Sequence, residues 1–235
     1  MDPGAKDSWN NFGQTFVDIS GNGYNFSLGT TTGVAADDPA FYGSVGMESS
    51  NEYFQYDGGD FFLATNANDT LINSLHKVGA TYSCVGFVYP LSTGRCGIFH
   101  TGGSVTSIGI HFYGSNTGAL FSYTGNGSAN SMDTTTALLN FNQVNMAAVS
   151  VSLDSTTSRT RNFYLNGVYQ STTVTSSFSF SSSAASSARI GASGDSSIIS
   201  ASGSRLLGLA VFDRTLVAAD FDSLRASALR RWPTI

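Results

Sequence analysis

Short runs that alternate apolar and polar residues follow one another along most of this chain, and clusters of Gly, Ser, Asn and Pro separate them. β-Branched and aromatic residues are frequent in the runs, which is typical of β-strands. We predict strands at residues 41–47, 52–63, 80–89, 97–101, 107–113, 119–123, 144–153, 161–170, 188–192 and 205–212. The runs recur at short intervals with no helical pattern between them. The sequence therefore favours two stacked antiparallel sheets over alternating strands and helices.

One hairpin can be assigned from its turn residues. Asn166 and Gly167 separate two strand-like runs, and this pair tolerates the positive φ angles of a type I′ turn. Two serine-rich stretches follow, at residues 172–187 and 191–204. We expect both to be long surface connections with a short strand between them.

A single helix is predicted, over residues 217–229. Phe221, Leu224 and Ala228 fall at positions i, i+3 and i+7, which gives the helix one apolar stripe that can lie on a sheet. Pro233 ends the helical pattern.

The two cysteines, Cys84 and Cys96, are expected to be free. If residues 90–94 turn the chain between two paired strands, Cys84 faces His100 and Cys96 faces Val88. An offset of four residues is roughly 13 Å along a strand, which is too far for a disulfide. Both side chains are then small buried groups in the apolar interior.

Composition limits the class of protein. The chain has 235 residues, which one all-β domain over residues 1–235 can accommodate with a sizeable core. Only 11% of the residues are charged, and the net charge is −5. Ser, Thr, Asn and Gly make up the difference, as is typical of neutral, β-rich extracellular or virion proteins rather than cytoplasmic enzymes.

Several partners and locations are disfavoured. The eleven Lys and Arg are scattered, so the basic stripe that nucleic acid would require is missing. No apolar run approaches the ~18 residues of a membrane span. The first residues lack the layout of a signal peptide, so we expect the protein to reach a virion surface or the extracellular space by another route, such as lysis with a virus particle. Removal of a signal from this sequence is the alternative.

The order of segments resembles the laminin-G-like domains of the concanavalin-A-like lectin and glucanase superfamily, found in bacterial and phage surface proteins. Seven segments carry the resemblance, at residues 16–24, 53–58, 82–90, 144–149, 163–168, 189–191 and 206–216. Among them are Asp18-Ile19-Ser20-Gly21-Asn22-Gly23 and Tyr164-Leu165-Asn166-Gly167, which are similar to the family's "D-x-S-G-N-G" and "Y-v-N-G" motifs. The resemblance implies a jelly-roll sandwich of two antiparallel sheets with one short C-terminal helix.

The sequence departs from the family at two places. Val217 and Asp220 stand where the family has a Ser or Thr N-cap followed by Glu, so we expect the capping box to be lost. Leu207 and Gly208 replace an acidic pair, which places an apolar side chain on a face that is often wet in the family. We therefore expect the chain itself or a partner to cover that face.

The carboxylates of a glucanase site are missing. Glucanases of this fold carry Glu-x-Asp-x-x-Glu or a close variant on one strand, whereas the two glutamates here, Glu48 and Glu52, have no Asp between them. The sequence therefore predicts no enzyme. Hydrolysis by aspartates alone is the alternative, with Asp57, Asp60 and Asp69 close in sequence.

The three histidines are expected to be structural. His76, His100 and His111 show no spacing typical of a zinc site, although the last two lie on neighbouring predicted strands.

Two sets of candidate binding residues remain. Tyr89, His111, Tyr113 and Tyr123 combine flat apolar faces with polar tips that suit sugar stacking; core packing is the alternative for each. By resemblance, calcium is the candidate cofactor, with Asp18, Asp57 and Asp60 as ligands. The alternative is that Asp18 and Asp57 form Asx turns that end strands.

Three hypotheses of function follow. The first is a non-catalytic virion-surface protein of a bacteriophage, either a capsid decoration protein or a fibre-tip adhesion module. It would dock on capsid or tail proteins and bind a cell-surface glycan, and homo-oligomerisation stays open. The second is a free lectin-like carbohydrate-binding module. The third is a polysaccharide hydrolase or lyase with an unfamiliar site.

Overall fold

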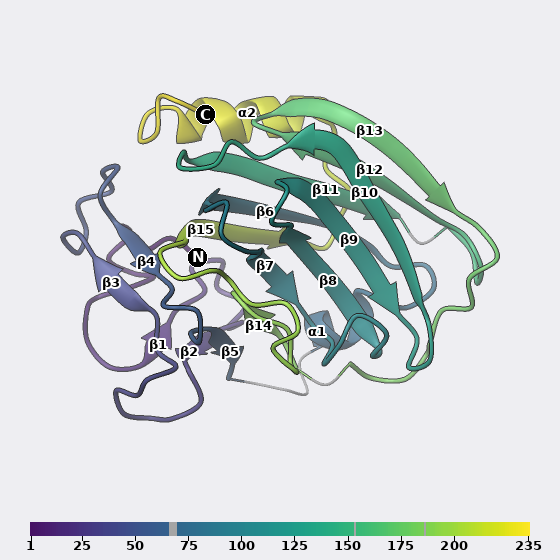
Figure 1. Cartoon of the computed structure of the whole chain (residues 1–235), viewed down its shortest axis with the longest axis horizontal. Coiled ribbons are helices and arrows are strands. Elements are labelled where there is room, and N and C mark those ends of the chain that lie inside the picture. Colours follow the sequence, from purple (N-terminus) through teal and green to yellow (C-terminus); the bar gives the residue numbers. More distant parts are fainter. Residues whose placement is uncertain (66–69, 153, 186) are drawn as a thin grey trace.

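The computed structural model describes residues 1–65, 70–152, 154–185 and 187–235, and within them two antiparallel sheets face each other (Figure 1). Sheet A has the strand order β1 (Thr15–Phe16), β2 (Phe26–Leu28), β5 (Phe62–Ala64), β14 (Arg189–Ile190), β7 (Cys96–His100), β8 (Gly109–Gly114), β9 (Ala119–Gly125) and β10 (Asn130–Leu138). Sheet B has the order β13 (Val168–Thr175), β12 (Arg159–Leu165), β11 (Asn145–Ser152), β6 (Thr81–Tyr89), β15 (Arg205–Phe212), β4 (Tyr53–Gln55) and β3 (Ala40–Tyr42). The predicted β-sandwich is confirmed.

The main core fills the space between the sheets. Alternation along each strand sends every second side chain inward, so that Ile110 and Phe112 of β8 join the core while His111 and Tyr113 point to the outer face. Phe54 of sheet B and Phe62 of sheet A meet across the core with ring centroids 4.9 Å apart. This packing fixes which residues each sheet presents outward.

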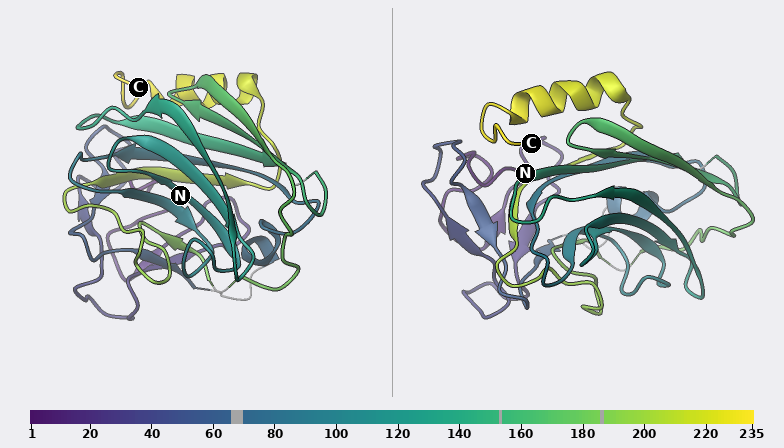
Figure 2. Two further views of the ribbon diagram at one scale, coloured as in Figure 1. Left: turned by 45° about the vertical axis from the view of Figure 1, so that its right-hand side comes forward. Right: turned by 45° about the horizontal axis from the view of Figure 1, so that its top comes forward.

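A second core lies on the outer face of sheet B, where α2 (Ala218–Ala228) covers the strands (Figure 2). Phe221 stacks on Tyr164 with centroids 3.9 Å apart, and Trp232 packs on Phe87 at 5.2 Å. Leu207 is buried in this cluster. The expectation that this face is covered is therefore confirmed, and the chain itself provides the cover.

The start of α2 corrects one expectation. The carboxylate of Asp220 accepts a hydrogen bond from the backbone N–H of Val217 at 2.9 Å and pairs with Arg214 at 3.1 and 3.2 Å. Half of the capping box is thus retained, because Asp220 takes the place of the usual Glu while Val217 has no side-chain acceptor. The helix itself agrees with its predicted range.

The predicted hairpin is also confirmed. β12 and β13 pair on either side of Asn166 and Gly167, whose φ angles are 52° and 79°. Positive φ at both positions is what a type I′ turn requires. β13 continues to Thr175, however, so the first serine-rich stretch begins as a strand and not as a surface connection.

Two predicted strand arrangements were wrong. The run at residues 52–63 divides into β4 and β5, which belong to different sheets, because Gly58 turns the chain with φ 102°. β6 and β7 also lie in opposite sheets rather than forming a hairpin. The register assumed for Cys84 and Cys96 is therefore incorrect, although both cysteines are free and buried as expected.

Several elements were not predicted as they stand. The strands β1, β2 and β10 and the short helix α1 (Thr70–Ser74) were missed. The second serine-rich stretch is not only a surface connection, since its Ser193, Ile198 and Ser200 are buried. Residue 153, the last of one predicted strand, lies outside the described residues.

Candidate functional site

Three aromatic rings gather on the outer face of sheet A. Tyr113 of β8 pairs directly with Phe121 of β9, and His111 pairs with Tyr123, so the register places them side by side. Ring centroids lie 5.3 Å apart for Tyr113 and Phe121, 5.9 Å for Tyr113 and Tyr123, and 6.1 Å for Phe121 and Tyr123. The planes differ by 10–19°, so the three rings share one orientation.

Two flexible side chains border these rings. Met132 of β10 pairs with Tyr123 and is 47% exposed. The exposed Arg95 places its guanidinium 5.7 Å from the centroid of Tyr113 and donates a hydrogen bond to the carbonyl of Ser197. We call the set of Arg95, Tyr113, Phe121, Tyr123 and Met132 the aromatic face. Tyr113 is only 4% exposed, whereas Phe121 and Tyr123 are half-buried, so the last two offer most of the accessible ring surface.

His111 lies on the same side of sheet A but beneath loops. The N–H of Gly194 donates to the carbonyl of Gly102 at 3.2 Å, and the N–H of Asp195 donates to Gly103 at 2.8 Å, which joins two loops over the sheet. His111 is fully buried and shares one Nδ1–Nδ1 hydrogen bond of 3.1 Å with His100. It therefore lies beside the aromatic face on the same side of the sheet but does not meet solvent.

The two histidines are neutral at neutral pH. Burial lowers the pKa of His111 to about 4, and burial together with the nearby His111 and Arg189 lowers the pKa of His100 well below its usual value. His76 is buried elsewhere, where its Nε2 bonds to the carbonyl of Ser183 at 2.7 Å.

Tyr89 lies apart from the aromatic face, because β6 belongs to sheet B. The guanidinium of Arg205 is held between the rings of Tyr53, at 4.3 Å, and Tyr89, at 4.5 Å. Tyr42 stacks on Tyr53 with centroids 5.2 Å apart. The structure thus unites three of the four predicted ligand-binding residues and places the fourth in a separate cation–π stack.

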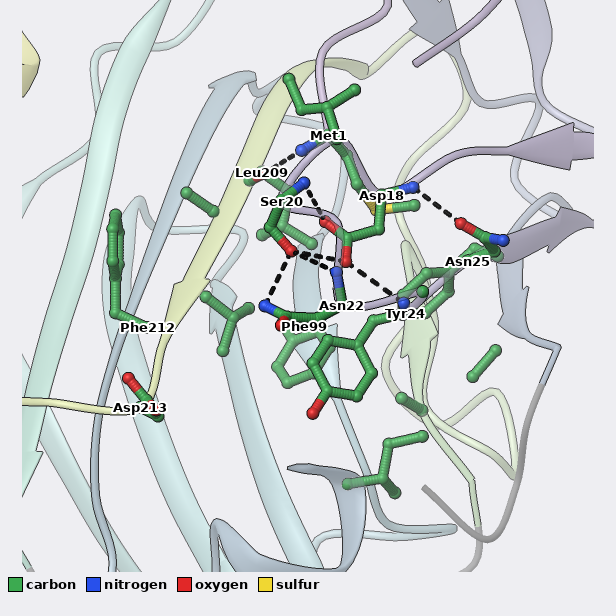
Figure 3. Close-up of a pocket in the computed structure, with 18 residues that line it drawn as sticks. Met1, Asp18, Ser20, Asn22, Tyr24, Asn25, Phe99, Leu209, Phe212 and Asp213 are labelled. Carbon is green, nitrogen blue, oxygen red and sulfur yellow. Dashed lines mark hydrogen bonds between the residues drawn. The ribbon is translucent and has the colours of Figure 1, made fainter. Parts of the chain in front are cut away.

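Asp18 organises a loop at the rim of a pocket (Figure 3). Its carboxylate accepts hydrogen bonds from the N–H and hydroxyl of Ser20, at 2.9 and 2.7 Å, and from the N–H of Tyr24 at 3.2 Å. Partial burial raises the pKa of Asp18, but these hydrogen bonds outweigh it and leave the pKa below its ordinary value. The side chain makes the Asx turn that was the alternative to calcium ligation.

The pocket beside Asp18 has a volume of about 500 Å³. Phe26 and Phe99 of sheet A and Leu209 and Val211 of sheet B line it, together with the polar residues of the Asp18 loop. An apolar floor with a few polar groups at the rim suits the apolar part of a small molecule or side chain.

Asp57 and Asp60 line a different hollow, of about 280 Å³, together with Asp38 and Tyr42. The N–H of Asp57 donates to the carboxylate of Asp60 at 2.7 Å, and the carboxylate of Asp57 accepts from the N–H of Gly59 at 2.7 Å. Burial, followed by the nearby Asp57 and Asp38, raises the pKa of Asp60 to about 7.

The three predicted calcium ligands are therefore not brought together, since Asp18 lines one pocket and the other two line another. Within the part of the chain that the structure describes, no group of three His, Cys, Asp or Glu residues could hold a metal ion. Calcium binding stays a prediction from the resemblance.

The remaining acidic candidates do not form a pair on one strand. Glu52 is 1% exposed, and its carboxylate accepts hydrogen bonds from the N–H and hydroxyl of Ser49. It holds the loop that contains Glu48. Asp69 lies outside the described residues.

Part of the aromatic face was missed from the sequence. Alternation along residues 119–123 puts Phe121 on the same side of β9 as Tyr123, so this ring could have been included. Arg95 precedes β7 on a connecting segment, and no periodic signal indicates that it reaches Tyr113.

No family model matches this sequence, and no curated protein matches it. Solved structures do share the fold. The receptor-binding domain of botulinum neurotoxin type G aligns with a TM-score of 0.59 and 12% identity, over 90% of this chain and 48% of that chain. The binding domain of botulinum neurotoxin serotype D gives 0.59 and 13%, over 91% and 48%. Trypanosoma rangeli sialidase gives 0.54 and 11%, over 92% and 31%.

These similarities define the class of fold. The chain is a β-sandwich of two antiparallel sheets, and it spans about half the length of the neurotoxin domains that it resembles. At such low identity the matches show the fold alone. No helix among the described residues has the length and apolar character needed to cross a membrane.

Proposed function

We propose that this chain is a non-catalytic binding domain that recognises a glycan through the aromatic face. The observation that carries the proposal is the set of three nearly parallel rings on the outer side of sheet A, with Phe121 and Tyr123 partly open to solvent. Aromatic rings provide flat apolar surface for the C–H face of a sugar, and tyrosine hydroxyls add polar contacts.

The surroundings of the rings support a preformed site. The hydroxyl of Tyr113 donates to that of Tyr123 at 3.4 Å, and Arg95 places further N–H donors beside Tyr113. Strands β8 and β9 hold the rings, so little ordering is needed on binding. Structural neighbours with the same sandwich include receptor-binding domains of neurotoxins and a sialidase, which is consistent with recognition of a receptor or a sugar.

Glycan-array binding by the purified chain tests the proposal. We expect saturable binding to a defined glycan, and a loss of about 5–30-fold in affinity on Phe121→Ala or Tyr123→Ala, since an anchoring ring contributes about 1–2 kcal/mol. Tyr169→Ala is the matched control, because Tyr169 is a 49% exposed tyrosine on sheet B. An array that stays blank at high protein concentration would count against glycan recognition.

The finer proposal is that a bacteriophage particle carries this domain, as a capsid decoration protein or a fibre-tip module. The low content of charged residues and the resemblance to phage surface domains support it. Mass spectrometry of purified particles from a producing culture should detect the chain bound to capsid or tail proteins. A protein that is free and monomeric in such a culture would favour the lectin-like alternative.

The hollow at Asp60 favours one second candidate, a polysaccharide hydrolase. A carboxyl group with a raised pKa beside an exposed carboxylate resembles an acid paired with a base. Release of reducing ends from a polysaccharide by the wild type and its loss in Asp60→Asn would establish this activity. Absence of turnover across neutral and acidic polysaccharides supports the non-catalytic proposal.

A further inference from the structure

The interior of the sandwich is polar at the end formed by β10, β12 and β13. Arg159 and Arg161 point inward from β12, two residues apart, and both are 0% exposed. Ser131 of β10 faces them from the opposite sheet and is 4% exposed. Two guanidinium groups therefore lie between the sheets at a depth where most sandwiches carry apolar side chains.

Arg161 has a carboxylate and several hydrogen-bond acceptors as partners, although its Nε has no acceptor among the described residues. It forms an ion pair with Asp133 of β10. Its Nη2 donates to the carbonyl of Ser131 at 2.7 Å, and its Nη1 donates to the hydroxyl of Thr175 at 3.1 Å. The charge of this guanidinium is thus balanced by one carboxylate.

Arg159 is different, because its charge has no counterpart. Its Nη2 donates to the carbonyl and hydroxyl of Ser131, at 3.2 and 2.9 Å, but its Nε and Nη1 find no hydrogen-bond acceptor among the described residues. No carboxylate of the described chain lies within ion-pair distance of it. Its other neighbours include the ring of Phe180, 5.3 Å away, and the buried phenol of Tyr82 on β6.

This guanidinium stays charged at neutral pH. Burial lowers the pKa of Arg159 to about 9, which still leaves the group protonated. Arg159, Arg161 and Asp133 together hold one excess positive charge in the interior. Buried charges are normally paired, since an unpaired one loses its hydration without compensation.

Further donors lie on the facing strand. Ser122 and Thr124 of β9 are at most 1% exposed, and apart from a contact between Ser122 and the phenol of Tyr82 their hydroxyls have no hydrogen-bond partner among the described residues. The register pairs Thr124 with Ser131 and Ser122 with Asp133, so these hydroxyls lie on the same inner side of sheet A as the groups that meet the arginines. Ser131 is hydrogen-bonded to Arg159 and paired with Thr124, so the hydroxyl of Thr124 occupies the strand position beside the residue that meets Arg159.

We propose that the polar chamber made by Arg159, Arg161, Ser122, Thr124 and Ser131 binds one small monovalent anion of the size of chloride. Arg159, Arg161 and Asp133 together carry one excess positive charge, so one anion with a single negative charge neutralises them. The lining side chains are at most 4% exposed, so a larger organic anion has no open path to them. Guanidinium N–H and hydroxyl groups are the donors that bind halides.

The anion would join the two sheets. Arg159 belongs to β12 in sheet B, whereas Ser122, Thr124 and Ser131 belong to β9 and β10 in sheet A. An ion held between them provides at this end the cross-sheet attraction that apolar packing provides elsewhere. This role is independent of what the aromatic face binds.

Thermal unfolding of the full chain in sodium chloride and in sodium gluconate, at equal ionic strength, tests the proposal. An anion that binds only the folded state should raise Tm by about 3–6 °C for each tenfold increase of chloride above its dissociation constant. Arg159→Met should remove the difference between the two salts. Arg230→Met, which removes an exposed arginine that follows α2, should keep it.

Two results would overturn the proposal. The first is equal Tm values of the wild type in both salts, which is the result expected if a buried water occupies the chamber. The second is an undiminished chloride response in Arg159→Met. If that variant does not fold, crystals of the wild type grown in bromide decide. An anomalous peak beside Arg159 supports the site, and no peak there refutes it.

Discussion

Replacing Asp60 by asparagine should stabilise the protein at neutral pH and leave it unchanged in acid. Asp60 is 3% exposed, and its pKa is about 7 against an ordinary value of 3.8. Asparagine has the shape of the protonated acid: its oxygen can accept the N–H of Asp57, and its amide can donate to the carboxylate of Asp57. The variant therefore keeps the contacts and loses the ionisation.

The raised pKa of Asp60 determines the direction in which stability changes with pH. Below about pH 4 the carboxyl group is protonated in both the folded and the unfolded chain, and ionisation costs no stability. As the pH rises from about 4 to about 7, the unfolded chain releases the proton while the folded chain retains it, so the stability of the wild type falls. The asparagine variant does not undergo this loss.

The magnitude is a few kcal/mol at most. The difference between a pKa of about 7 in the folded chain and the ordinary value of 3.8 corresponds to about 4 kcal/mol. Because the hollow is open to water and the charged form can be partly rehydrated, we expect about 2 kcal/mol above pH 7. Urea unfolding at several values between about pH 4 and pH 8 measures the difference.

The matched control is Asp222→Asn, an exposed position on α2, which should follow the wild type across this range. If Asp60→Asn is no more stable than the wild type above pH 7, Asp60 is ionised in the folded protein. The hollow would then not disfavour a negative charge on Asp60.

Two further outcomes follow from burial. Leu207→Ala should lower the free energy of unfolding by about 2–5 kcal/mol, because Leu207 is 2% exposed beneath α2 and its truncation leaves a cavity. Leu138→Ala, at a 53% exposed position, should change the free energy of unfolding by less than about 0.5 kcal/mol. Equal effects of the two substitutions would contradict the second core. A thiol reagent should leave Cys84 and Cys96 untouched in the native protein, since burial raises the pKa of both thiols, and should label both after unfolding. Labelling of the folded chain within minutes would show that these thiols are accessible.

The elements predicted correctly include those whose signal lies within a short stretch of sequence. The helix at Phe221 and the hairpin at Asn166 and Gly167 have such signals, and both formed as expected. Alternation along β8 places Tyr113 outward, and alternation along β9 places Phe121 on the same side as Tyr123. Only the structure shows that β8 pairs with β9, which brings Phe121 beside Tyr113.

The misses have physical causes. β10 escaped because its inward residues, Ser131, Asp133 and Thr135, are polar, and a search for apolar alternation assumes an apolar interior. Ser131 and Asp133 meet the buried arginines of β12, whose donors satisfy their oxygen atoms. The sheet membership of β6 and β7 depends on pairing with strands far away in sequence, so no local pattern could reveal it. Tyr89 was grouped with Tyr113 for the same reason.

The place of β15 within sheet B has a consequence for how the chain acquires its structure. β15 is hydrogen-bonded to β6 on one side and to β4 on the other, yet it is the last strand of sheet B to be synthesised. Until residues 205–212 leave the ribosome, the middle of this sheet has a gap, and the backbone edge of β6 is open to pairing with other molecules. Completion must wait for a contact between distant parts of the chain, so we expect slow folding and a long-lived, aggregation-prone intermediate during synthesis.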